Sequence, residues 1–222
     1  MKLINLTKME LVSYTTSQIL HFFPDNRQDN THSHIEAHID QTLDRLKKNI
    51  NAVLAWPKDE FNYLHSSQYC HYLYFLANTI WNAAGNPVLC TKLFLLNKAL
   101  NGIDCFYEIE LPDIFYIGHS LGIVLAKATY SNYMVLYQNS TVGKNHGVAP
   151  ILEEGVVLYP NTAIIGRSRV RRGTILSQGT SVINQDTPGM CVVYPGLAGK
   201  LVFKQPKRSV LEDIFRNPLR GE

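Results

Sequence analysis

The chain has 222 residues, of which 45% are hydrophobic and 18% are charged, and its formal net charge is +3. A chain of this length buries an ample core as one compact body, or as one body with a smaller helical part, and the composition excludes intrinsic disorder for the chain as a whole. The net charge is too small to indicate nucleic-acid binding, so we expect no nucleic-acid partner.

The sequence also argues against a membrane-bound or secreted protein. The longest apolar or aromatic run in the helical half, residues 72–77, has six residues, whereas a membrane-spanning helix needs about 20. Residues 1–12 contain neither an apolar signal core nor a cleavage site of small residues. Four cysteines are too widely spaced for a zinc site, which favours buried, reduced thiols: Cys70, Cys90, Cys105 and Cys191. We therefore expect a cytoplasmic protein with no membrane partner.

The first hundred residues are predicted to be helical. Only one of the 14 glycines falls within them, so the two halves of the chain differ in backbone composition. Hydrophobic residues spaced three and four apart predict three helices, over 35–53, 68–84 and 88–100. Gly85-Asn86-Pro87 ends the second helix and Asn101-Gly102 ends the third. The polar segment 24–33 is predicted to be a loop.

The second half repeats every six residues. Aliphatic residues occupy six consecutive positions of the repeat: Leu152, Leu158, Ile164, Val170, Leu176 and Val182. A small or β-branched residue follows each of the first five by four positions: Val156, Thr162, Ser168, Thr174 and Thr180. This pattern predicts short strands joined by tight corners, stacked coil upon coil around an aliphatic core.

The same phase is predicted to continue upstream, although more loosely. Its positions are Leu111, Ile117, Ile123, Thr129, Val135 and Thr141. Residues 144–149 interrupt the count between the two runs. They are therefore predicted to form a loop that projects from the coils.

The six-residue ladder resembles the left-handed parallel β-helix of the hexapeptide-repeat acyltransferases. A helical domain before the ladder resembles the layout of the serine O-acetyltransferases in particular. Residues 96–104 resemble that family's last helix running into a G-[VI]-D start of the coil, and residues 68–73 its aromatic–Arg–x–Ala–His helix, with Gln68 in place of the arginine. Three further segments resemble family motifs: 117–124 the stretch D-H-x-x-G-I-V, 137–143 the strand L-Q-x-V-T-L-G, and 193–200 the closing turn G-x-P-A-[KR].

The resemblance implies an α+β fold in three parts. These are an N-terminal α-helical domain (1–102), a left-handed parallel β-helix acyltransferase domain (103–204) and a short C-terminal tail (205–222). It also implies a homotrimer, with acetyl-CoA lying in the groove between two β-helices as a co-substrate and no permanently bound cofactor. The acetyl group would pass directly to a small hydroxyl-bearing acceptor, without a covalent enzyme intermediate. Whether two trimers pair through the helical domain is left open.

His119 is the candidate general base and Asp104 is its candidate partner. Removal of a hydroxyl proton suits a side chain whose pKa is near neutrality, as that of imidazole is. The resemblance places the catalytic histidine at His119 and an orienting aspartate fifteen residues earlier, at Asp104. This spacing permits a contact without establishing one, so Glu108 and Glu110 remain reserve candidates. The alternatives are a histidine bonded to a neighbouring carbonyl and an aspartate in a helix-to-coil turn.

The acceptor site departs from the family pattern in two places. Gly118 stands where the family has an aspartate, and 148–150 read Val-Ala-Pro where the family has Arg-His-Pro. In the family these polar groups help to hold serine, and a zwitterion buried without charged partners is unfavourable. We therefore expect an acceptor other than L-serine, with a sugar hydroxyl favoured. Genuine L-serine acetylation is the alternative, with Lys144 and His146 as substitute holders.

The donor is expected to lie along the coils. Backbone amides predicted to pair with the pantetheine arm lie near Gly143, Tyr159, Ser177 and Gly179, although Tyr159-Pro160 replaces a Gly-Ala pair of the family. Lysines and an arginine near the closing turn are either partners of the coenzyme A phosphates or a solvated basic tail: Lys200, Lys204, Lys207 and Arg208. Four clustered arginines are either a solvated surface or an anion site: Arg167, Arg169, Arg171 and Arg172.

Three further expectations concern partners and function. The residues at 220–222 read Arg-Gly-Glu, without the terminal isoleucine of the family members that dock cysteine synthase, so no such docking is expected. His34 and His38 lie one helical turn apart with no third ligand in view, so no metal site is expected. A non-catalytic trimeric β-helix scaffold is the remaining alternative, supported by Gly118 and by the bulk of Tyr159.

Overall fold

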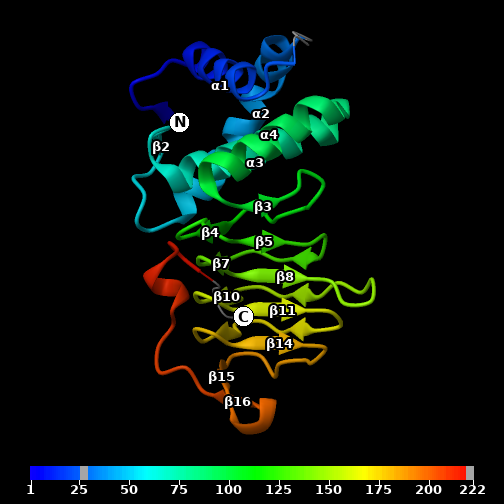
Figure 1. The fold of residues 1–222 in the computed structure, drawn as a ribbon. Helices are drawn as coiled ribbons and strands as arrows, with labels where there is room; N and C mark the ends of the chain where they lie inside the picture. Colours follow the sequence, from blue (N-terminus) through cyan, green and yellow to red (C-terminus); the bar gives the residue numbers. More distant parts are fainter. Residues whose placement is uncertain (26–29, 219–222) are drawn as a thin grey trace.

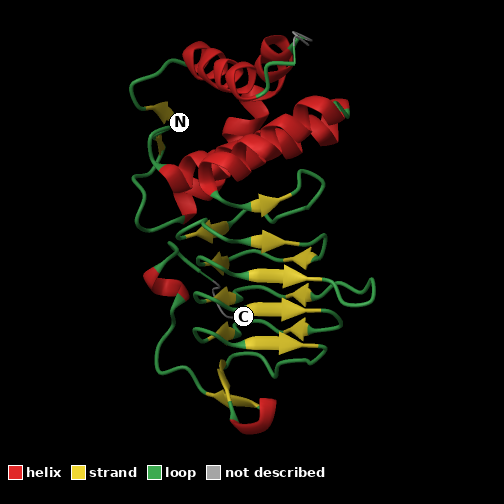
Figure 2. Cartoon of the chain, in the orientation of Figure 1, coloured by secondary structure: helices red, strands yellow, loops and turns green. Residues whose placement is uncertain are grey.

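The computed structural model describes residues 1–25 and 30–218. Helices form one end of the molecule, and short strands wind into a column below them (Figure 1). Figure 2 shows that the strands belong to this column, apart from a short pair near the N-terminus. The last helix ends at Asn101 and the first strand of the column begins at Asp104, so the change from helix to strand falls between these residues.

The described part of the N-terminal region contains four helices: α1 (Lys8–Phe22), α2 (Thr31–Ala52), α3 (Ser66–Ala84) and α4 (Pro87–Asn101). The three helices predicted from hydrophobic spacing correspond to α2, α3 and α4. Helix α2 nevertheless begins at Thr31, inside the segment predicted to be a loop, because Thr31 is itself buried one turn before Ile35. Residues 26–29 of that segment lie outside the described residues.

Helix α1 was missed by the spacing argument, although its N-terminus has a clear sequence signal. Thr7 Oγ1 accepts a hydrogen bond from the Glu10 amide at 3.2 Å, and Glu10 Oε2 accepts one from the Thr7 amide at 2.7 Å. This reciprocal pair is a capping box, which satisfies amide groups that the first turn leaves unbonded. The short parallel pair of β1 (Lys2–Leu3) and β2 (Glu60–Phe61) joins the segment before α1 to the segment before α3.

The column is a parallel β-solenoid of about five turns. Its strands form three sheets. The first sheet contains β4 (Phe115–Ile117), β7 (Met134–Leu136), β10 (Val157–Leu158), β13 (Ile175–Leu176), β15 (Val192–Pro195) and the antiparallel β16 (Leu201–Lys204). The second contains β3 (Asp104–Cys105), β5 (Val124–Leu125), β8 (Thr141–Gly143), β11 (Ala163–Ile165) and β14 (Ser181–Ile183). The third contains β6 (Thr129–Tyr130), β9 (Ile151–Leu152) and β12 (Arg169–Val170).

The aliphatic ladder lies inside the column, as predicted. All six of its residues from Leu152 to Val182 are fully buried. Leu158 pairs with Leu136 on one neighbouring coil and with Leu176 on the other. Each coil therefore covers the apolar side chains of the next, which is the source of stability in a stacked repeat.

The predicted phase upstream is wrong by one position after Ile123. The residues that point inward there are Leu125, Tyr130, Leu136 and Val142, whereas Thr129 is exposed. Val142 pairs with Leu125 and Ile164, which fixes the register of the second sheet. The physical reason is a pair of irregular corners, because Leu125 follows Ile117 by eight positions and Tyr130 follows Leu125 by five. The two steps together are therefore one position longer than two regular repeats.

The described part of the C-terminal tail returns along the column to the helices (Figure 1). Phe215 is buried and forms an antiparallel bridge with Val53, just after α2. The Arg216 guanidinium donates hydrogen bonds of 2.5 to 3.2 Å to the carbonyl oxygens of residues 51, 53, 54 and 56. The tail thus ties the column to the helical region. The expectation that the chain does not dock cysteine synthase rests on residues 220–222. These residues lie within 219–222, outside the described residues.

Phe115 of β4 is fully buried where the helices meet the column. Its ring stacks on that of His71, with centroids 4.6 Å apart and 15° between the planes, and its centroid lies 5.6 Å from that of Phe75. Asn49 of α2 donates from Nδ2 to the Phe115 carbonyl at 2.9 Å. Two helices therefore hold this one strand residue.

His71 is a buried titratable group at the same contact. Its Nδ1–H donates to the Ser67 carbonyl at 2.6 Å, and its Nε2 is buried without a hydrogen-bond partner. Burial lowers the pKa of His71 to about 4, because a charged imidazolium loses hydration there.

We expect this shift to appear in the pH dependence of stability. The unfolded chain, with a histidine pKa of about 6.5, takes up the proton before the folded chain does as the pH falls. The stabilisation is therefore complete above about pH 6.5 and is lost towards about pH 4, by about 3 kcal/mol in all. Urea unfolding of the wild type and of His71→Asn across this range checks the sign. The wild type should lose that much more free energy of unfolding than the variant; parallel curves would contradict the assignment.

Candidate active site

His119 lies on an unusually long corner between the first and second sheets. Six residues, 118–123, separate β4 from β5, whereas four, 137–140, separate β7 from β8 on the next coil. The two additional residues form a turn through Gly122, whose φ of +74° favours glycine. His119 is exposed on this turn. The imidazole of His119 is therefore accessible, while its role as general base stays a prediction.

The helical region holds both sides of this corner. Ser67 at the start of α3 donates from Oγ to the Gly118 carbonyl at 3.2 Å. Ser120 donates from Oγ to the Asn101 carbonyl at 2.6 Å, and the Gly122 amide donates to the Gly102 carbonyl at 2.9 Å. These bonds fix the backbone on either side of His119 while leaving the imidazole itself unbonded to any described residue.

The structure does not pair His119 with Asp104. The Asp104 carboxylate instead forms an ion pair with Lys98 of α4, with Nζ and Oδ2 2.6 Å apart. The reserve candidates are also engaged, since Glu108 pairs with Lys127 at 3.2 Å and Glu110 accepts hydrogen bonds from Asn78 and Asn82. A catalytic role for Asp104 therefore stays a prediction that requires its release from Lys98.

The residue before His119 makes a close contact that sequence reasoning did not foresee. A Cβ atom placed on Gly118 would lie 2.6 Å from Tyr137 Cε1 and 3.4 Å from Tyr116 Cε1. Real Cβ atoms do not approach carbon so closely, so any larger residue here must displace the Tyr137 ring. The Tyr137 ring in turn stacks on that of Tyr159, with centroids 5.5 Å apart and only 5° between the planes.

Three of the four residues predicted to hold the pantetheine arm lie on the same edge as His119. Tyr159 follows β10, and Ser177 and Gly179 follow β13, so all three lie between the first and second sheets. Gly143 ends β8 and therefore lies at the opposite edge of the second sheet. Sequence spacing alone could not assign these residues to one edge of the sheet or the other, because each coil of the chain runs along both edges.

The predicted loop projects from the column after β8 (Figure 1). Backbone hydrogen bonds of 2.9 and 3.0 Å between Asn145 and Val148 close its tip, on which Lys144 and His146 are exposed. The loop follows the C-terminal end of β8, whereas the His119 corner precedes the parallel neighbour β5. One copy of the chain therefore does not bring Lys144 and His146 to His119.

The basic side chains predicted to meet the donor's phosphates lie at the far end of the column. Lys204 ends β16, and its Nζ lies 5.4 Å from the centroid of the Tyr194 ring. Lys200 precedes β16 and is exposed, while Arg208 pairs with Asp213 at 3.3 Å. Two of the four clustered arginines are also paired, Arg169 with a glutamate at 2.6 Å and Arg172 with one at 3.5 Å.

Solved structures that share this architecture include serine acetyltransferases. The protein from Brucella abortus strain S19 aligns over 90% of this chain and 84% of its own, with a TM-score of 0.71 and 15% sequence identity. That from Neisseria gonorrhoeae aligns over 94% and 84%, also at a TM-score of 0.71 and 15% identity. The fold is that of the serine acetyltransferases.

A serine acetyltransferase in complex with CoA shares this fold as well. It aligns over 89% of this chain and 86% of its own, with a TM-score of 0.67 and 16% identity. No protein-family model matches the chain, and no curated protein matches its sequence. The serine acetyltransferase fold confirms the expected helical region followed by a left-handed parallel β-helix.

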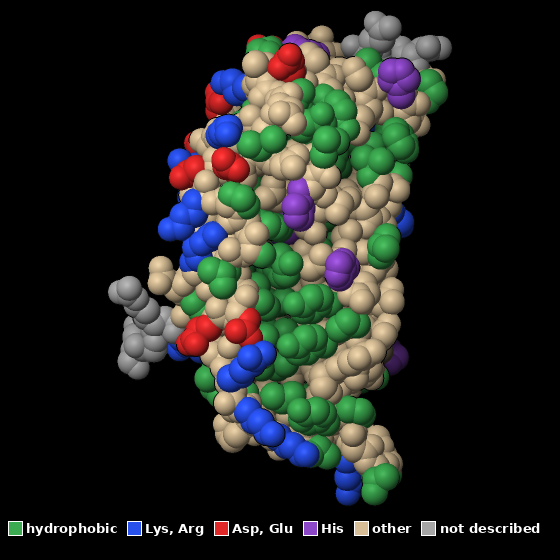
Figure 3. Space-filling model, turned by 90° about the vertical axis from the view of Figure 1, so that its left-hand side faces the viewer, with side chains coloured by type: hydrophobic (Ala, Val, Ile, Leu, Met, Phe, Trp, Pro, Cys, Tyr) green, Lys and Arg blue, Asp and Glu red, His purple; other side chains and the backbone are tan. Residues whose placement is uncertain are grey.

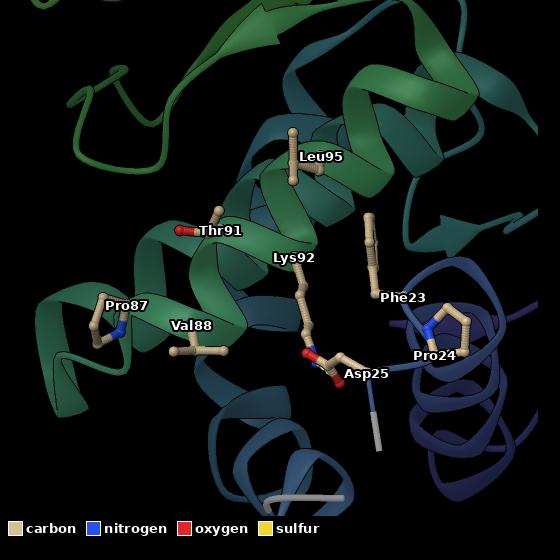
Figure 4. A pocket seen from close by; sticks show the side chains of 8 residues that line it. All are labelled: Phe23, Pro24, Asp25, Pro87, Val88, Thr91, Lys92 and Leu95. Carbon is tan, nitrogen blue, oxygen red and sulfur yellow. Dashed lines mark hydrogen bonds and ion pairs between the residues drawn. The ribbon is translucent and has the colours of Figure 1, made fainter. Parts of the chain in front are cut away.

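A separate cavity of about 600 Å³ lies in the helical region, between the end of α1 and α4 (Figure 4). At this cavity Lys92 reaches Asp25, with Nζ and Oδ2 2.9 Å apart. None of the residues predicted to carry chemistry lines it. Within the described residues, no three potential metal ligands come together, and no helix is long and apolar enough to cross a membrane.

Proposed function

We propose that this chain is an acetyl-CoA-dependent O-acetyltransferase in which His119 is the general base. The observation that carries the proposal is an exposed imidazole, free of hydrogen bonds to the described residues, on a corner whose backbone the helices hold in place. A neighbour with this fold was solved in complex with CoA, which supports coenzyme A chemistry along the same edge. Tyr159, Ser177 and Gly179 on that edge supply backbone groups for the pantetheine arm.

The reaction is a direct transfer. The acceptor's hydroxyl oxygen bonds to the thioester carbonyl carbon while its proton passes to the imidazole of His119. The carbon–sulfur bond of acetyl-CoA then breaks, and the proton passes from the imidazolium to the departing thiolate. The products are an acetyl ester and the free thiol of coenzyme A. No covalent bond to the protein is needed.

The acceptor we favour is a sugar hydroxyl rather than L-serine. Gly118 offers no carboxylate for an ammonium group, and the Tyr137 ring occupies the space that a side chain there would need. Val148 and Ala149 offer no charge for a carboxylate. A zwitterion in this site would therefore lose hydration without gaining charged partners.

L-serine acetylation is the second candidate, and it depends on assembly. Lys144 and His146 reach a His119 corner only if that corner belongs to a neighbouring copy, as in the trimer that the fold resemblance implies. A groove between two such columns would also receive acetyl-CoA. A neighbour with this fold was solved in complex with serine, which keeps this candidate open to test.

Coenzyme A is expected to raise the melting temperature of the protein. A ligand that binds only the native state at about 100 times its Kd stabilises it by about 2.7 kcal/mol, which corresponds to about 5 to 10 °C for a chain of this size. Differential scanning fluorimetry with increasing coenzyme A measures the shift. A melting temperature that does not move at millimolar coenzyme A would favour the non-catalytic scaffold and contradict the proposal.

A further inference from the structure

Three departures from the serine acetyltransferase motifs meet at one place in the structure. Gly118 stands where the motif has aspartate, Tyr137 where it has leucine, and Tyr159 where it has glycine. They lie on three successive coils, and the Tyr137 ring touches both of the others. Changes that are scattered over more than forty positions in the sequence thus form a single surface beside His119.

This surface is a row of aromatic rings, which we call the tyrosine row: Tyr116, Tyr137 and Tyr159. The Tyr137 and Tyr159 rings are nearly parallel, and Tyr116 Cε1 would lie 3.4 Å from the same Cβ position on Gly118. Trp56 extends the row towards the helices, with its ring centroid 5.7 Å from that of Tyr116. Figure 3 shows that hydrophobic side chains gather along the middle of one face of the molecule.

The tyrosine row is only partly buried and carries no charge. Burial raises the pKa of the Tyr116 and Tyr137 phenols, and the neighbouring phenols raise that of Tyr137 further. In the described part of the chain, none of the three hydroxyl groups makes a hydrogen bond or takes part in an ion pair. The row therefore presents apolar ring carbons together with unused neutral hydroxyl groups.

These properties select among acceptors that carry an aliphatic hydroxyl. A pyranose ring has an apolar C–H face to lie against a tyrosine and hydroxyls at its edge to bond phenol groups. It brings no charge, so it does not suffer the loss of hydration that a zwitterion would suffer here. An acyl acceptor that rests on the row would lie close to the His119 corner, because His119 directly follows Gly118 in the chain.

We propose that the tyrosine row is the acceptor platform and holds a neutral pyranose ring beside His119, with Tyr137 as its central contact. This inference rests on the proposed acetyltransferase function and names the residues that choose its acceptor. Tyr137 therefore has two roles. Its ring occupies the space that a side chain at position 118 would need, and it contributes to the outer side of the row, which binds the sugar.

The test is a comparison of three tyrosine variants. Tyr137→Leu and Tyr159→Leu each remove one ring from the row, and Tyr14→Leu removes a half-buried ring from α1 as the matched control. Saturation-transfer NMR with the methyl pyranosides of glucose, galactose, mannose and N-acetylglucosamine measures binding without catalysis. Thiol release from acetyl-CoA with the same sugars gives kcat and KM.

We expect at least one of these sugars to receive saturation on one ring face. The KM for that sugar should rise about tenfold in Tyr137→Leu and Tyr159→Leu, while the KM for acetyl-CoA of Tyr137→Leu and all constants of Tyr14→Leu stay within about twofold. Circular dichroism confirms that each variant is folded, and Tyr159→Leu carries the test if Tyr137→Leu does not fold.

Each other outcome is decisive. If no sugar binds while thiol release with L-serine persists, the platform is wrong and the acetyltransferase stands. If sugars bind through Tyr137 but no acceptor releases thiol, the platform stands and the proposed function fails. If either variant lowers the mass measured by sedimentation, the row is a contact between copies of the chain and the platform is overturned.

Discussion

Replacing His119 with alanine is expected to lower kcat/KM for acetyl transfer by about 10²- to 10⁴-fold, the usual contribution of a general base. The imidazole is exposed and makes no hydrogen bond to the described residues, so its removal leaves no buried group unpaired. The fold and the melting temperature should therefore be unchanged. Thiol release from acetyl-CoA, followed with the acceptor that the wild type uses best, measures the loss.

The matched control is His21→Ala, which removes an exposed histidine from α1. It should retain wild-type activity, since His21 bonds, among the described residues, only to the Ser17 carbonyl within its own helix. A His119→Ala variant as active as this control would remove His119 from the mechanism. The corner would then be a structural turn.

Replacing Phe115 with alanine is expected to cost about 3 to 5 kcal/mol of unfolding free energy, which is typical of an aromatic side chain deleted from a core. Its ring is fully buried between the column and α3, where it contacts His71 and Phe75. The resulting cavity would lie at the contact that joins the helices to the column. Urea unfolding followed by circular dichroism measures the change.

Two comparisons make the Phe115 result specific. Phe115→Leu keeps most of the volume and should cost less than the alanine variant. Phe22→Ala, at a side chain that is 48% exposed at the end of α1, should change stability by less than about 1 kcal/mol. A Phe115→Ala variant no less stable than Phe22→Ala would show that the helices and the column do not depend on this contact.

The column could be predicted from the sequence because its repeat is local. Each aliphatic residue from Leu152 to Val182 follows the previous one by six positions, and all six are buried. The prediction was wrong where corners change length, since Leu125 follows Ile117 by eight positions and Tyr130 follows Leu125 by five. Periodicity counts positions, and a net gain of one position turns every predicted inward side chain to the other face.

The candidate site was predictable only in part. Residue type and local motif drew attention to His119, whose corner the structure shows to be lengthened and exposed. The ion pair of Asp104 with Lys98 was not foreseen, because it joins the last helix to the first strand. The stacking of Tyr137 on Tyr159 was also missed, because it depends on which residues of successive coils share a register.

The central claim is that an acceptor hydroxyl receives the acetyl group of acetyl-CoA at the His119 corner. Mass spectrometry of the acceptor after incubation with isotope-labelled acetyl-CoA tests it most directly. We expect a labelled acetyl ester on a pyranoside with the wild-type protein, and little or none with His119→Ala. Unlabelled acceptors with the wild type, or equal labelling by both proteins, would contradict it.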